Sequence, residues 1–592
     1  MIKPYKLKSH LCRFCTFYSA GDEKIPAALL NYENEKPDLE GFAYPLPSKK
    51  SDYTCFAKIG EIEWYGASNG LTRYDANAER EEDIVMYFSA PRDLLDNNIK
   101  AIMPDGDNVW VLTDSGAAYI EMRTVGAEEK ADILLAETLK YVDRRGMISQ
   151  KRLFEGRNLD SIKPYGHSDN DGTFTGNFAF GEMYRYATFR REKGDDHPDT
   201  VKARAVATRA VEACLLLLYV HSRGDGFAAR TYLCADEPVP DDGLFLRITD
   251  GKATCLKTTD SEKRGVTGTV IDASAPVPER LAKLYTEKGY TINDIIYKAD
   301  TSSDEITHHF INLLTAHEIL GGDDEELDAI IVDATKNMMT HIIKHGYELH
   351  DFTGKPTTWA KWSVEYFNTE FGWVDGTLNS AQLLMYLLVT MKVTGEEGIW
   401  REHYDKLINE LGYADRAEKH FDRLYQASLS MGFDYFEDIM YGDHMLATLA
   451  YFGICTLEKD ENLLAKYRKG YKAWRTSIER EHNPGYDLLY AVACPDEEVD
   501  LERHAEWFYR TNASRLAAGV SLVGRHDVPV KKLRAGAEEI STLLPPDERF
   551  ISKYDRNPYD LKNEDSGGIM CVESCYVYTL AYWFGRYYGF FE

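Results

Sequence analysis

Acidic and polar side chains gather in six short segments, each placed directly before an apolar helical stretch. Two segments hold enough carboxylates for acid–base chemistry: 167–172, His-Ser-Asp-Asn-Asp-Gly, and 301–305, Thr-Ser-Ser-Asp-Glu. Because two buried like charges cannot both ionise at low cost, one carboxyl of such a cluster shifts toward its protonated form. A protonated acid beside an ionised carboxylate is what cleavage of a glycosidic bond needs. We therefore expect Asp171 and Asp304 to be the catalytic pair.

The other four segments are 373–376, 441–444, 482–487 and 564–568. Side chains of Asp, Ser and Asn accept hydrogen bonds from the unpaired N–H groups at a helix start, so capping alone explains any one segment. The prediction of a site depends on the occurrence of six such segments in one chain.

Further residues near these segments are expected to bind or position a substrate. Acidic neighbours would tune the catalytic pair, and aromatic rings would pack against the apolar face of a sugar. A cation is needed for any substrate carboxylate, because the chain as a whole is acidic. The predicted substrate-binding residues are Asp169, Arg230, Glu305, His308, Tyr366, Trp373 and Asp375.

Two patterns could also suggest a metal ion. Asp169-Asn170-Asp171-Gly172 looks like the start of a calcium loop, but the later Glu ligand is absent at the required spacing. Asp304, His308 and His167 could form a site, although a hydrogen-bonded core histidine is commoner. We expect no metal and no cofactor.

Charge and composition limit the partners. The 592 residues contain 97 Asp+Glu against 69 Lys+Arg, a net charge of -28, which would repel nucleic acids and anionic membrane surfaces. No secretory signal is visible, and ten scattered cysteines are typical of reduced thiols in the cytoplasm. A carbohydrate remains the expected partner, and the sequence does not indicate an oligomeric state.

Two kinds of helix dominate from residue 127 onward. Residues 325–345 carry one apolar stripe, whereas 378–391, 445–454 and 569–584 are apolar almost all round and should be buried on every side. Amphipathic helices alternating with fully buried ones are expected of an α/α-barrel. The alternative is an irregular helical bundle or a solenoid.

Residues 1–125 are expected to form a β-rich domain. Trp64 begins a strand–turn–strand pattern that recurs 46 residues later at Trp110, a spacing typical of propeller blades. Residues 126–592 would form the catalytic barrel, with a β-hairpin insert at about 225–275.

Three segments carry a family resemblance: His-Ser-Asp-Asn-Asp-Gly at 167–172, Phe-Ala-Ala-Arg-Thr-Tyr at 227–232, and Asp-Thr-Ser-Ser-Asp-Glu-Ile-Thr-His-His-Phe at 300–310. Together they resemble bacterial six-hairpin glycosidase-like proteins, over roughly residues 160–320. The resemblance implies a mainly α fold with an (α/α)6 toroid and action on sugars, including those with uronic acids.

The leading hypothesis is therefore a glycoside hydrolase acting on an oligo- or polysaccharide. One alternative is a polysaccharide lyase on the same scaffold, in which His167, Tyr366 and Arg230 would matter more than the aspartates. Another is a carbohydrate-binding protein without catalysis, which would gain little from burying like charges.

Overall fold

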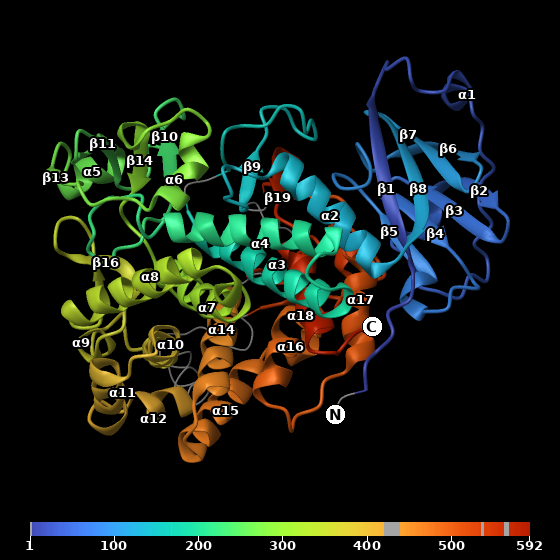
Figure 1. Ribbon diagram of the computed structural model, residues 1–592. Coiled ribbons are helices and arrows are strands. Elements are labelled where there is room, and N and C mark those ends of the chain that lie inside the picture. Colours follow the sequence, from blue (N-terminus) through green and yellow to red (C-terminus); the bar gives the residue numbers. More distant parts are fainter. Residues whose placement is uncertain (1–2, 167–168, 420–438, 534–537, 562–566) are drawn as a thin grey trace.

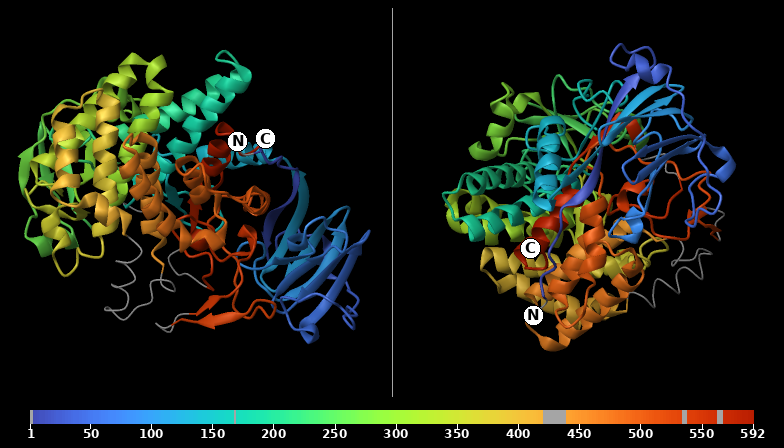
Figure 2. Two further views of the ribbon diagram at one scale, coloured as in Figure 1. Left: turned by 90° about the horizontal axis from the view of Figure 1, so that it is seen from below. Right: turned by 90° about the vertical axis from the view of Figure 1, so that its right-hand side faces the viewer.

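The computed structural model describes residues 3–166, 169–419, 439–533, 538–561 and 567–592. Figure 1 shows β-sheets of the N-terminal part on one side, a central mass of helices, and a second β-rich region on the far side. The chain passes through the parts in that order and then returns, so that C-terminal segments lie beside the N-terminal sheets (Figure 2).

Residues 10–125 form two antiparallel four-stranded sheets, with strand orders β1-β8-β7-β6 and β2-β3-β4-β5. The sheets bury one apolar cluster between them, which includes Trp64, Phe88, Ile102 and Val111. The strands are β1 His10–Ser19, β2 Tyr53–Ile59, β3 Ile62–Ala67, β4 Gly70–Tyr74, β5 Val85–Phe88, β6 Ile99–Asp105, β7 Asn108–Thr113 and β8 Gly116–Val125.

The two tryptophan repeats are the equivalent hairpins β3–β4 and β7–β8. Each second strand opens with a glycine at positive φ, Gly70 at 102° and Gly116 at 140°. A Cβ would lie 2.7 Å from Phe88 O at Gly70 and 2.1 Å from Tyr18 O at Gly116. Only glycine fits both turns, which explains why the repeat is visible in the sequence.

The second β-rich region is a five-stranded sheet of order β10-β14-β11-β12-β13, and it reaches past the predicted insert to Lys298. Three two-stranded sheets lie elsewhere in the described residues. The strands are β9 Gln150–Arg152, β10 Tyr232–Cys234, β11 Phe245–Thr249, β12 Lys252–Cys255, β13 Val270–Asp272, β14 Ile295–Lys298, β15 Glu348–His350, β16 Pro356–Lys361, β17 Val530–Lys532, β18 Glu538–Ile540 and β19 Cys571–Glu573.

The predicted fold class, mainly α with an (α/α)6 toroid, is wrong. Helices make up 43% of the chain and strands 19%, and the strands form several antiparallel sheets, so the class is mixed α/β. Seven of the strands after residue 126 are only three residues long. So short a strand shows no alternation of apolar and polar residues, and the long buried helices dominated the prediction.

The described residues contain 17 α-helices. Six of them contact one another in the order α3, α7, α10, α14, α16, α18, and α18 packs against α3 in turn. These six are α3 Asp171–Lys193, α7 Ser303–Ile319, α10 Gly376–Thr394, α14 Tyr441–Leu457, α16 Pro484–Ala493 and α18 Tyr576–Tyr587. The others are α1 Ala27–Leu30, α2 Ala127–Tyr141, α4 Pro198–Leu216, α5 Thr259–Arg264, α6 Glu279–Thr286, α8 Glu325–Lys344, α9 Val364–Phe367, α11 Gly398–Asn409, α12 Tyr413–Glu418, α15 Glu461–Thr476 and α17 Leu501–Arg510.

Five of the six contacting helices begin within or directly after one of the six acidic segments. The exception is α18, which begins at Tyr576 rather than at the predicted Ile569, because β19 occupies 571–573 and pairs with β9. None of the helices in the described ranges has the length and apolarity needed to cross a membrane.

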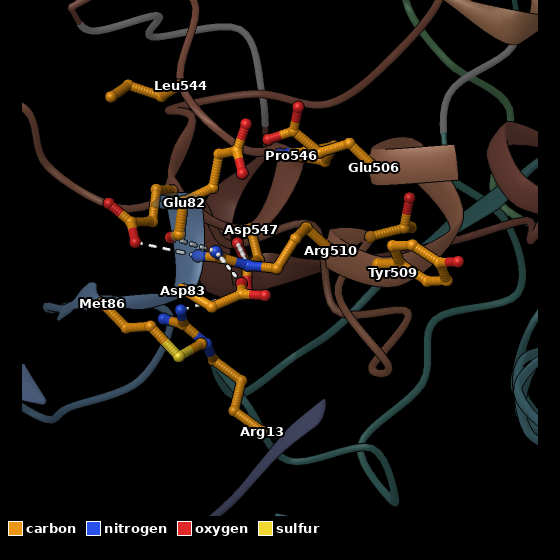
Figure 3. Close-up of polar contacts among 12 residues, drawn as sticks. Arg13, Glu82, Asp83, Met86, Glu506, Tyr509, Arg510, Leu544, Pro546 and Asp547 are labelled. Atoms are coloured by element: carbon orange, nitrogen blue, oxygen red, sulfur yellow. Dashed lines mark hydrogen bonds and ion pairs between the residues drawn. The ribbon is translucent and has the colours of Figure 1, made fainter. Parts of the chain in front are cut away.

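Buried charges join the N-terminal sheets to the C-terminal part of the chain (Figure 3). Arg510, at the end of α17, is fully buried. Its guanidinium donates to Asp547 Oδ1 at 2.9 Å, Glu548 Oε1 at 2.9 Å and Asp83 Oδ1 at 2.8 Å. Asp547 also lies 3.0 Å from Arg13 of β1. One cluster therefore connects β1, the turn before β5, α17 and the segment 546–548.

Replacing Arg510 by Ala should lower the free energy of unfolding by about 3–5 kcal/mol, because Asp547 and Glu548, both buried, and the partly exposed Asp83 each lose a cationic partner. The matched control is Lys58→Ala, which breaks surface ion pairs with Glu61 and Glu63 and should cost less than about 1 kcal/mol. Urea unfolding followed by tryptophan fluorescence measures both. Equal stability of the two variants would contradict a structural role for Arg510.

Candidate active site

Four acidic side chains meet where the contacting helices begin. Asp304 lies in the first turn of α7, and Asp443 lies in the first turn of α14. Asp375 directly precedes α10, and Asp555 comes from the irregular segment 551–560. All four are partly exposed. The charge of Asp304 acts on Asp443, as does that of Asp375, and Asp555 acts on Asp304. We call these four residues the acidic cluster.

Desolvation by the surrounding protein and the neighbouring charge of Glu305 raise the pKa of Asp304 to about 7. Arg230 opposes the rise, and Asp555 adds to it. Desolvation also raises the pKa of Asp443 to about 7, with further contributions from Asp375 and Asp304. Such a pair holds one proton between its members around neutral pH.

The location of Asp304 and Asp443 at helix N-termini does not cancel the rise in their pKa. A helix N-terminus stabilises a carboxylate by about 0.3–1 kcal/mol, which is less than one pKa unit. The pKa of Asp304 nevertheless rises from 3.8 to about 7. Desolvation and like charge therefore outweigh the favourable end of the helix.

Asp171, the other predicted catalytic residue, is buried at the start of α3 and has partners of its own. Arg144 Nη2 donates to Asp171 Oδ2 at 2.6 Å, and Thr231 Oγ1 donates to the same oxygen. Arg144 also donates to Tyr232 O of β10 at 2.6 Å. These bonds fasten α3 to β10 and pair the Asp171 carboxylate with a buried cation, unlike Asp304 and Asp443.

Three predicted substrate-binding residues, Asp169, Arg230 and Glu305, do come together. Arg230 lies 3.3 Å from Asp169 Oδ1 and 3.7 Å from Glu305 Oε2, and its Nη2 donates to Asn170 Oδ1 at 2.8 Å. Glu305 accepts from Ser302 Oγ at 2.6 Å. Arg230 is thus engaged by the protein, and its position offsets the charge of Glu305 next to Asp304.

The start of α3 packs directly against α7 at this point. A Cβ on Gly172 would lie 3.2 Å from Glu305 Cγ and 3.3 Å from His309 Nε2. The ion pairs of Arg230 therefore lie where α3 and α7 pack closely together.

His308 is buried and uses both ring nitrogens. Its Nδ1 lies 2.8 Å from Asp304 O, and its Nε2 lies 3.2 Å from Asn177 Oδ1. Burial lowers the pKa of His308 to about 4, so the ring is neutral at pH 7. His167 lies outside the described residues. Among those described, no group of three or more His, Cys, Asp or Glu side chains is placed to hold a metal ion.

The predicted aromatic residues lie just before α10. Tyr366 donates to Asp375 Oδ2 at 2.6 Å and thereby orients one member of the acidic cluster. Burial and the charge of Asp375 raise the pKa of Tyr366, so this phenol is a poor base. Trp373 is partly exposed, and the ring of Phe371 is 78% exposed.

The sequence prediction gave no role to Asp443 or Asp555. Asp443 could have been found, because it stands one residue further into α14 than Asp304 stands into α7. Asp555 lies in an irregular segment with no periodic pattern, and only the tertiary structure brings it to the cluster.

Comparison with known proteins adds little. No family model matches the chain, and no curated protein sequence matches it. One similar solved structure is described as Bacteroides ovatus GH9, at 8% identity over 92% of this chain and 97% of that chain, with a TM-score of 0.35. A TM-score this low does not establish a shared fold, so the function has to be inferred from the side chains.

Asp171→Asn should reduce the free energy of unfolding by roughly 2–4 kcal/mol, because buried Arg144 loses its nearer counter-charge and keeps only Glu237 at 3.9 Å. Asp304→Asn removes a charge that has unfavourable neighbours and should not destabilise. Urea unfolding of both variants, side by side, tests the different roles of the two aspartates. A stable Asp171→Asn protein would show that the Arg144 pair is not structural.

Ionisation of Asp443 should lower the stability of the folded protein as pH rises. Its pKa is about 7 in the folded protein and 3.8 ordinarily, so the folded state binds more protons between these values and stability falls from about pH 4 to pH 7. Asp443→Asn cannot ionise and should melt at a higher temperature than wild type at pH 8, with a smaller difference at pH 5. The control is Asp105→Asn at an exposed strand end, which should follow wild type at both pH values. An Asp443→Asn curve parallel to wild type would contradict the raised pKa.

Proposed function

We propose that this protein hydrolyses glycosidic bonds in an oligo- or polysaccharide, with Asp304 and Asp443 as the reacting carboxyls. One observation carries the proposal: two partly exposed carboxyl groups, at the starts of α7 and α14, interact electrostatically and both have a pKa of about 7. Glycoside hydrolysis needs one carboxyl protonated and another ionised at the same pH.

In the proposed reaction Asp304 is the general acid. Glu305 and Asp555 disfavour its ionised form, so we assign the shared proton to it. Asp304 gives this proton to the glycosidic oxygen as the bond to the anomeric carbon breaks. Asp443 takes a proton from a water molecule, whose oxygen bonds to the same carbon. The proton then returns from Asp443 to Asp304 through solvent.

Neighbouring side chains support these roles. Asp375, oriented by Tyr366, helps to raise the pKa of Asp443. Phe371 and Trp373 precede Asp375 in the chain and offer rings on which the apolar face of a sugar can pack. No comparable observation favours a lyase, because Tyr366 is held by Asp375 and has a raised pKa.

Asp304→Asn and Asp443→Asn should each lower turnover by at least about a hundredfold, while the melting temperature at pH 6 changes little. A panel of neutral and uronate-containing polysaccharides, with an assay for new reducing ends, first identifies a substrate. Asp105→Asn serves as the matched control and should keep wild-type turnover.

Three results would count against hydrolysis at this pair. Near-normal turnover in both variants would remove Asp304 and Asp443 from the reaction. Products that absorb ultraviolet light through a new double bond would indicate a lyase. Saccharide binding without any product would indicate a binding protein.

A further inference from the structure

A polar cavity lies apart from the acidic cluster, between the N-terminal sheets and the C-terminal part of the chain. Its volume is about 510 Å³, and its lining includes Arg549, Trp507, Tyr559, Glu481 and Glu506. Figure 3 shows Glu82, Glu506 and Pro546, which also line the cavity, beside the ion pairs of Arg510. The cavity therefore lies next to the buried charges that join the two parts of the protein.

Arg549 is the unusual member of this lining, because it is a buried cation without a close counter-ion. Only 4% of the residue is exposed, and its Nε donates to Leu544 O at 2.6 Å. In the part of the chain that the structure describes, no carboxylate oxygen lies within 4.0 Å of its guanidinium nitrogens. Burying a cation in this way costs free energy unless an anion accompanies it.

The neighbouring buried arginines show the contrast. Arg510 and Arg525 each pair with carboxylates at 3.0 Å or less. Although burial alone would lower the pKa of Arg510, Asp547 and Glu548 raise it. The pKa of Arg549 is lowered by burial, with Glu506 and Glu481 compensating only in part. The guanidinium of Arg510 is therefore already paired with carboxylates of the protein, whereas that of Arg549 can still pair with an anion.

The two acids near Arg549 do not fill this role. Glu481 is buried and accepts a hydrogen bond from the Tyr441 hydroxyl at 2.6 Å. Burial raises the pKa of Glu481 to about 8, so it is mostly neutral at pH 7. Glu506 lies 4.0 Å from Arg80, which shares its charge. The cavity can therefore accept a carboxylate beside Arg549 without strong repulsion.

The rest of the lining is aromatic and polar. Trp507 and Tyr559 line the cavity with rings that are only 3% and 4% exposed, and the Trp507 indole donates from Nε1 to Val577 O at 2.7 Å and lies 5.5 Å from the guanidinium carbon of Arg549. Ser541 and Thr542, both exposed, place hydroxyl groups at the rim. Aromatic faces with hydroxyl donors and acceptors are the usual partners of a pyranose.

We propose that this cavity binds a uronic-acid unit, whose carboxylate pairs with Arg549. This inference rests on the proposed function for its link to catalysis, and it names an acidic sugar as part of the substrate. Tyr441, which contacts Glu481 of the cavity lining, stands two residues before Asp443, so one helix start, that of α14, carries contacts to both the cavity and the acidic cluster. Arg549 rather than Arg230 then supplies the cation for the uronate, since Arg230 is already engaged by Asp169, Asn170 and Glu305.

Titration of the full-length protein with glucuronate, galacturonate and glucuronamide, followed by calorimetry, tests the site. We expect saturable binding of at least one uronate, and binding at least about tenfold weaker for the uncharged amide. Arg549→Gln should weaken uronate binding by a similar factor, and Arg549→Lys should recover only part of it because a lysine cannot make the bidentate pair.

Because Arg549→Gln removes the hydrogen bond to Leu544 O and could fail to fold, a second variant is needed. Ser541→Trp, at the exposed rim, should block the cavity and abolish uronate binding at a wild-type melting temperature. Absence of saturable binding of both uronates to the wild-type protein would overturn the proposal. So would unchanged binding in folded Ser541→Trp or in folded Arg549→Gln.

Asp304→Asn separates this inference from the proposed function. The variant should bind uronates as wild type does while losing hydrolysis. Uronate binding together with undiminished hydrolysis in Asp304→Asn would refute the catalytic assignment and leave the cavity assignment intact.

Discussion

The interaction on which the site depends is the repulsion among carboxyls held at the starts of packed helices. Asp304, Asp375 and Asp443 each begin a different helix, and the closed series of helix contacts fixes where those helices start. The acids cannot move apart without disturbing the apolar packing of α7, α10 and α14. The packing free energy of the helices thus maintains an arrangement of charges that would not assemble in water.

The protein places its compensating cations selectively. Arg230 and Lys298 lie with Asp169 on the side of Glu305, where they neutralise charge between α3 and α7. The side chain of Asp375, by contrast, accepts a hydrogen bond from the neutral hydroxyl of Tyr366. Positive charge therefore offsets the acids next to Asp304, whereas a neutral donor orients Asp375 next to Asp443.

Features with a local cause could be predicted from the sequence. The two hairpins that contain Trp64 and Trp110 depend on a glycine turn, and the long helices α8, α10, α14 and α15 follow from their apolar patterns. The fold class was wrong, because strands such as β9 and β19 are three residues each and pair across more than 400 positions. Such pairing leaves no local pattern.

Some residues of the candidate site could likewise be predicted from the sequence, and others could not. The segments that hold Asp304 and Asp375 were visible, since each precedes a buried helix. The pairing of Asp171 could not be predicted, because its partner Arg144 belongs to a turn 27 residues earlier and its partner Thr231 lies 60 residues later. Whether a carboxylate is free or paired is decided by tertiary contacts, which the sequence does not display. His167 and the acidic residues Glu564 and Asp565 lie outside the described residues.

The buried cluster around Arg510 also bears on the order in which the chain folds. Arg510 contacts the backbone of Glu82 across 428 residues, and Glu548 accepts from the N–H of Tyr87 across 461. At a synthesis rate of about 5–20 residues per second, the N-terminal sheets leave the ribosome roughly 20–90 s before these partners exist. During that time Asp83 has Arg80 but not Arg510 as a cationic partner. Docking of the C-terminal segments against the N-terminal sheets is therefore a late event in biosynthesis.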